Sequence, residues 1–141
     1  MRRLIPLLLL ALSVIAAACN EGDPGIVQPT VNPATVTDTF TGNLALQGAN
    51  SHAFVITVTG KIAITLTSIG PPPTAEVGIG LGIPVGLTCS LTLGDGTRTT
   101  TTAGTTPQIS GTILPGTFCV AVFDAGMLAE PVDYTVTVAH P

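Results

Sequence analysis

The sequence predicts an all-β fold, an antiparallel β-sandwich of about seven to nine strands. Charged residues make up only 9% of the chain, while 16 glycines and 12 prolines supply many turns. From residue 37 onward, short runs that alternate apolar and polar side chains are separated by turn residues. After residue 19, no segment has the 3.6-residue apolar period of an amphipathic helix. We therefore expect one β-sandwich domain over residues 37–141.

Residues 1–18 have the pattern of a signal peptide. Arg2 and Arg3 precede an apolar stretch of 15 residues, 4–18. This stretch is shorter than the roughly 20 residues that a membrane-spanning helix needs. A charged start followed by a short apolar segment is typical of a secretory signal, so we expect the domain to be exported.

The signal peptide ends in three alanines followed by Cys19. This ending resembles the lipobox of bacterial lipoproteins, in which a cysteine after small residues is diacylated and becomes the new N-terminus. The family prefers leucine where this chain has Ala16. The resemblance implies a lipid anchor at Cys19 and a place in the cell envelope, and Asn20 in the next position favours the outer membrane. The alternative is an ordinary secretory signal cut near Ala18, with Cys19 left as a thiol.

Residues 19–36 are then expected to form the lipidated N-terminus and a flexible linker, because they hold three prolines and no apolar period. A chain that begins at Cys19 keeps Lys61 and Arg98 against eight carboxylates, a net charge of −6. Such an acidic surface repels phosphate backbones and argues against nucleic acid as a partner.

The first strands of the domain follow in order. Residues 38–46 form a weak alternating run. Residues 52–58 and 62–67 alternate more clearly on either side of a tight Gly60-Lys61 turn, which predicts a β-hairpin. The triple proline at 71–73 ends the ladder.

Between Val77 and Leu93, every odd position is apolar and every even position is glycine, proline, serine or threonine. This run is too long for one strand, and Pro84 with Gly86 predicts a break. We interpret the glycine face as a thin, weakly packed outer face near an edge, which would tolerate Gly80→Lys. The alternative is close approach by a partner or another sheet.

The last strands complete the sandwich. Residues 97–106 are rich in threonine and are expected to be irregular or an edge, and 109–113 form a short strand. Residues 114–124 are apolar on both faces, as in a central strand, and 132–139 alternate cleanly. We expect these last two runs to form a closing hairpin around the loop at 124–131.

Two segments of the sandwich carry a family resemblance. SHAFVITVTGKIAITLT, with its two apolar runs around a turn, and the ending PGTFCVAVFD followed by DYTVTVAHP resemble the bacterial pre-peptidase C-terminal family of small β-sandwiches. The likeness covers most of residues 37–141. It implies a β-sandwich that accompanies secreted enzymes, although no enzyme domain is present in this chain.

Cys89 and Cys119 are predicted to form a disulfide. Both would enter an oxidising compartment, and the proposed acylation commits Cys19 elsewhere, so they are the remaining pair. The alternative is two reduced thiols packed as small apolar groups.

No residue set in the sequence has the pattern of a catalytic or metal centre. The only histidines are His52, expected to be an ordinary surface residue, and His140, so neither a hydrolytic triad nor a zinc site is predicted. Calcium remains possible because four carboxylates lie in or beside loops, without the spacing of a calcium-binding loop. They are Asp95, Asp124, Glu130 and Asp133.

The absence of tryptophan, with Tyr134 on a core-facing position, argues against a carbohydrate module. We therefore expect a non-catalytic, lipid-anchored envelope module for interaction or structural roles. It would be joined to the membrane by its lipid and would contact a protein partner that the sequence does not identify. The alternative is a protein that binds a small ligand in the sandwich interior or binds its ligand through calcium.

Overall fold

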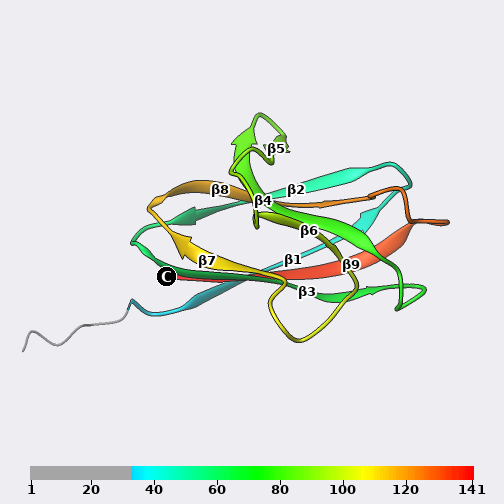
Figure 1. Ribbon diagram of the computed structural model, residues 1–141, viewed down its shortest axis with the longest axis horizontal. Helices are drawn as coiled ribbons and strands as arrows, with labels where there is room; N and C mark the ends of the chain where they lie inside the picture. Colours follow the sequence, from blue (N-terminus) through cyan, green and yellow to red (C-terminus); the bar gives the residue numbers. More distant parts are fainter. Residues whose placement is uncertain (1–32) are drawn as a thin grey trace, which may run out of the picture. The chain divides into compact units, whose positions relative to one another are not determined.

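The computed structural model describes residues 33–141, and these form two antiparallel β-sheets packed face to face (Figure 1). One sheet has the strand order β1-β9-β3-β7, and the other has the order β2-β8-β4-β5, with β6 also paired to β4. The prediction of an all-β sandwich is therefore confirmed. The strands are β1 (Val36–Leu44), β2 (Ala49–Ile56), β3 (Gly60–Gly70), β4 (Val77–Val85), β5 (Thr88–Ser90), β6 (Arg98–Thr101), β7 (Ile109–Ile113), β8 (Gly116–Phe123) and β9 (Val132–His140).

The core lies between the sheets and is built from the inward positions of nearly every long strand. β9 shows the principle, because its alternate residues from Val132 to His140 are buried while the residues between them are partly or fully exposed. Tyr134 is core-facing, as the alternation predicts. The largest fully buried side chains are Leu44, Ile56, Ile64, Leu66, Ile79, Val77, Val120, Val122, Val132, Val136, Val138 and Cys119.

The two predicted hairpins are wrong, because the strands of each pair lie in different sheets. β2 pairs with β8, whereas β3 pairs with β7 and β9. β8 pairs with β2 and β4, whereas β9 pairs with β1 and β3. In a sandwich, a short connection either returns within one sheet or crosses to the facing sheet, and both arrangements bury one face of each strand. Alternation of apolar residues therefore predicts the strands but does not distinguish these two connections.

The interpretation of the β4 glycines as a weakly packed outer face near an edge is also wrong. Along this stretch β4 lies between β8 and β6, and Gly78, Gly80 and Gly82 are buried. Gly78 is covered by the Phe123 ring, Gly80 by the Leu91 side chain and Gly82 by the backbone of Ser90. Close approach by another part of the same chain is therefore the reason for the glycines. Gly80→Lys is no longer expected to be tolerated.

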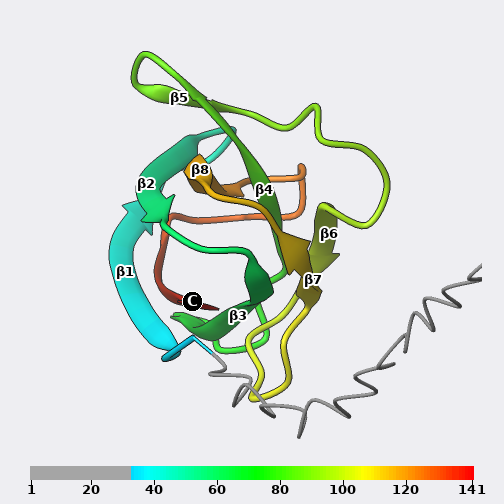
Figure 2. The ribbon, with the colours of Figure 1, turned by 90° about the vertical axis from the view of Figure 1, so that its left-hand side faces the viewer.

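The predicted break between two strands is confirmed. β4 ends at Val85, and Gly86 adopts a φ of 60°, which is in the left-handed region that favours glycine. The chain then returns as β5, so that β4 and β5 form a hairpin that rises from the sandwich at the top of Figures 1 and 2. The threonine-rich segment 97–106 contributes β6, an edge strand, as the sequence indicates.

Candidate functional site

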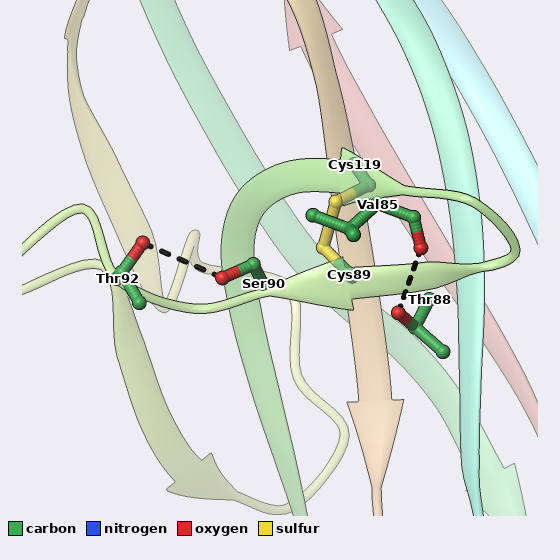
Figure 3. The surroundings of a disulfide bond; sticks show 6 residues. All are labelled: Val85, Thr88, Cys89, Ser90, Thr92 and Cys119. Atoms are coloured by element: carbon green, nitrogen blue, oxygen red, sulfur yellow. Dashed lines mark hydrogen bonds between the residues drawn. A yellow bond between two sulfur atoms is a disulfide. The ribbon is translucent and has the colours of Figure 1, made fainter.

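A disulfide joins the β4–β5 hairpin to β8 of the same sheet. The Cys89 and Cys119 sulfurs are 2.01 Å apart, and their Cα atoms are separated by 5.8 Å. The predicted bond is therefore present, and it links β5 to β8, where the hairpin crosses the outer face of that strand (Figure 3). Within the hairpin, the Thr88 hydroxyl donates a hydrogen bond to the Val85 carbonyl, with an O–O distance of 2.9 Å. The hairpin is thus fixed both internally and to the sandwich.

The tip of this hairpin carries exposed aliphatic side chains. Leu87, in the turn, is 97% exposed, and Val85 and Ile83 are 60% and 38% exposed. No charged residue occurs between residues 77 and 94. We call Ile83, Val85 and Leu87 the apolar tip. A cluster of exposed aliphatic side chains without charge is the type of surface that makes contacts with another molecule.

His52 is not the ordinary surface residue that the sequence predicts. Its ring is half-buried and stacks on Phe40, with 4.8 Å between the ring centroids. Its Nε2 atom lies 2.7 Å from the Tyr134 hydroxyl, and burial lowers the pKa of His52. The strand alternation contained this information, because His52 occupies the same face of β2 as the buried Phe54 and Ile56.

His140 forms a separate polar contact at the end of β9. It is 5% exposed, and its Nε2 atom lies 3.1 Å from Oδ2 of Asp38 on β1. Its Nδ1 atom lies 2.9 Å from the Pro141 carbonyl, and its ring stacks on Phe54. The hydrogen bonds of the two histidines within residues 33–141 therefore go to Tyr134, Asp38 and the chain's last residue. No serine or cysteine nucleophile in this part of the chain is therefore hydrogen-bonded to either imidazole.

The four loop carboxylates are not gathered into one site. Asp124 accepts backbone hydrogen bonds from Gly126, Met127 and Leu128 through Oδ1, and from Gln47 through Oδ2. These bonds, with that from Gln47 the strongest cause, lower the pKa of Asp124. Asp124 thus organises the β8–β9 loop.

Asp133 instead accepts a hydrogen bond from the Asn43 side chain at 2.9 Å. Within residues 33–141, no group of three or more histidine, cysteine, aspartate or glutamate side chains is placed to hold a metal ion. Two of the four carboxylates that the sequence singles out, Asp124 and Asp133, thus act in loop and strand contacts.

The surface of the sandwich carries several grooves, and two of them flank the β3–β4 loop. The larger, of about 600 Å³, crosses the outer face of β1, β9 and β3. It is lined mainly by hydroxyls, prolines and backbone, including Thr41, Ser68, Pro71, Asp133 and Thr135. The smaller, of about 330 Å³, lies between the β3–β4 and β8–β9 loops and is lined by Met127 and Leu128 with Glu76 and Glu130. Both are open surface features, distinct from the packed space between the sheets.

In comparisons with known proteins, no family model and no curated protein matches the chain. The resemblance to the pre-peptidase C-terminal family thus stays a prediction that rests on strand pattern. Cys19 and the signal segment lie outside the described residues. Over the part of the chain that the structure describes, no helix is long and apolar enough to cross a membrane. The candidate functional features are therefore the apolar tip and the two surface grooves.

Proposed function

We propose that this protein is a lipid-anchored, non-catalytic β-sandwich module of the cell envelope. The observation that carries the proposal is the sequence ending Ala16-Ala17-Ala18-Cys19 after a short apolar signal. The chain has three cysteines, and two of them, Cys89 and Cys119, are bonded to each other. Acylation accounts for the third. Asn20, directly after the acylated cysteine, favours the outer membrane if the envelope has two membranes.

The non-catalytic part of the proposal is supported by the environment of the two histidines. His52 and His140 each have hydrogen-bond partners that fix strands of the sandwich, and burial lowers the pKa of His52. A general base in a hydrolase needs a nucleophile within hydrogen-bond reach. Within residues 33–141, the His52 imidazole has only the phenol of Tyr134 as a hydroxyl partner, and the His140 imidazole contacts a carboxylate and a backbone carbonyl. We therefore assign both histidines to the architecture of the domain.

The interaction part of the proposal rests on the surface. The space between the sheets is filled by aliphatic side chains, which gives a ligand carried in the interior little support. The hydroxyl-lined groove across β1, β9 and β3 is instead accessible to another envelope component. Its threonine hydroxyls and the Asp133 carboxylate offer hydrogen bonds, which suits a polar partner surface.

The anchor is tested by Cys19→Ala. We expect wild-type protein in the membrane fraction and labelled by a palmitate analogue, and the variant in the soluble or secreted fraction, because two acyl chains give stable membrane binding. Wild-type protein that takes up no acyl label would contradict the proposal.

The role of the groove is tested by cross-linking in detergent-solubilised envelopes. Thr135→Arg places a long cationic side chain in the groove and should reduce cross-linked products of the wild-type protein. Thr117→Arg is the matched control, because Thr117 is an exposed threonine on β8 of the other sheet. Equal products from both variants would exclude the groove as the contact surface.

A further inference from the structure

We propose that the β4–β5 hairpin is a membrane-contacting finger that inserts the apolar tip into the interface of a lipid bilayer. The proposal rests on the proposed lipid anchor, which would keep the domain close to a membrane. The occupant of this surface is thus a lipid bilayer, and the argument uses the shape, composition, area and fixation of the hairpin.

The shape of the hairpin suits a bilayer. In two perpendicular views the hairpin rises above the rest of the domain (Figures 1 and 2). Leu87, in its turn, is 97% exposed, so the side chain is available without any rearrangement of the fold. A projecting aliphatic residue can enter a soft interface directly, whereas a protein partner would need a matching pocket.

The composition of the hairpin keeps the free-energy cost of entering the lipid low. No charged residue occurs between residues 77 and 94, whereas charged side chains are costly to bring into lipid. The backbone near the tip is paired internally, because Val85 is opposite Thr88 and Ile83 is opposite Ser90 in the antiparallel ladder. The Thr88 hydroxyl is also bonded to the Val85 carbonyl. Backbone groups that are already paired carry a smaller penalty on leaving water.

The area of the apolar tip favours lipid over protein. Three aliphatic side chains cover far less than the roughly 800 Å² that each partner contributes to a stable protein interface. A bilayer contact has no such requirement when acyl chains already hold the molecule at the membrane, because the tip then adds to an existing attachment. The 17 residues Asn20–Val36 span at most roughly 55 Å when extended, which leaves room for the domain to turn the tip toward the lipid.

The disulfide keeps the finger in place. Cys89 is in β5, directly behind the turn, and Cys119 is in the middle of β8. The bond prevents the hairpin from separating from the sheet beneath it (Figure 3). The apolar tip is therefore presented in a fixed orientation, so that its ordering costs little when it enters the membrane.

The test uses the absence of tryptophan from the chain. Leu87→Trp places one fluorescent reporter at the tip, and Leu114→Trp places one at a 66% exposed leucine between β7 and β8 as the matched control. Each lipidated protein is reconstituted into vesicles of phosphatidylethanolamine and phosphatidylglycerol. We expect the emission of Leu87→Trp to shift to shorter wavelength and to be quenched by brominated lipid. The emission of Leu114→Trp should not change.

A second measurement separates the finger from the anchor. The chain starting at Asn20 carries no lipid, and Leu87→Ser should weaken its partition into the same vesicles about tenfold, as expected for the loss of one leucine from an apolar contact. If the lipidated protein floats with the vesicles but the emission of Leu87→Trp neither shifts nor is quenched, the proposed finger is overturned and the proposed anchor is retained. A spectral shift of the lipid-free Leu87→Trp chain would support the finger even if Cys19 is not acylated. A concentration-dependent shift without vesicles would reassign the tip to self-association and overturn the proposal.

Discussion

The glycines of β4 allow a quantitative test of how β5 and the segment after it pack on β4. An added Cβ at Gly82 would overlap the backbone oxygen of Ser90, which is held by the β4–β5 ladder and by the disulfide at its neighbour. Backbone held in this way cannot move aside cheaply. We expect Gly82→Ala to lower the free energy of unfolding by about 1 to 3 kcal/mol, the usual cost of an overpacked core position.

Gly80 provides the first comparison. An added Cβ at Gly80 would lie 2.7 Å from Cδ2 of Leu91, the end of a flexible side chain. Leu91 can rotate away, so the same substitution should cost less, on the order of 1 kcal/mol. Gly111 on β7 is the matched control, because no heavy atom lies within 4 Å of an added Cβ there. Gly111→Ala should be neutral or should stabilise the domain by about 0.5 kcal/mol, since alanine restricts the unfolded chain.

The assay is urea unfolding of the three variants beside the wild type, with comparison of midpoints at constant slope. The expected order of stability is Gly111→Ala, then Gly80→Ala, then Gly82→Ala. Equal effects at Gly82 and Gly111 would refute the argument, because they would mean that Ser90 does not cover Gly82. In that case, the change in unfolding free energy caused by Gly82→Ala should also be the same whether the Cys89–Cys119 bond is intact or reduced.

Two further predictions concern the disulfide and His52. Replacing Cys89 and Cys119 by serine should lower the free energy of unfolding by about 3.7 kcal/mol, because the bond closes a loop with a sequence separation of 30. A thiol titration of the lipid-free chain from Asn20, denatured but not reduced, should find no free thiol. Burial lowers the pKa of His52, so the unfolded chain binds more protons there than the native protein does, and stability should fall as pH drops below the unfolded value of about 6.5. His52→Asn should flatten the stability profile below about pH 6.5, where the unfolded chain takes up this proton and the native protein does not. An unchanged profile would contradict the role of His52.

The strands, the core faces and the disulfide could be predicted from the sequence because each depends on local pattern or on simple counting. Alternation along β9 determines which of its residues face the core, and three cysteines with one in a lipobox-like ending leave one pair. Strand partnership could not be predicted. The connection between β2 and β3 crosses from one sheet to the other, and this crossing produces the same alternation as a hairpin does.

The candidate site was predicted less well, because it depends on contacts between distant segments. The sequence predicts a surface position for His52, although its face of β2 is the buried one, and only the structure shows Phe40 and Tyr134 around it. The glycines of β4 indicate close approach, but the sequence does not reveal that Leu91 and Ser90 provide it. The carboxylates in loops suggested calcium, whereas Asp124 is occupied by backbone hydrogen bonds of its own loop.

The apolar alternation between Val77 and Leu93 continues where the core does not. Val77, Ile79 and Leu81 are buried between the sheets, whereas Ile83, Val85 and Leu87 continue the same odd-numbered series beyond Gly82, in the part of the hairpin that rises from the sandwich. Burial in the core explains the first three residues and cannot explain the last three. Exposed aliphatic residues at a turn gain nothing for folding, and polar residues there would keep the chain more soluble. The apolar tip is thus better explained by a contact outside the domain, and a lipid surface supplies that contact without a complementary pocket.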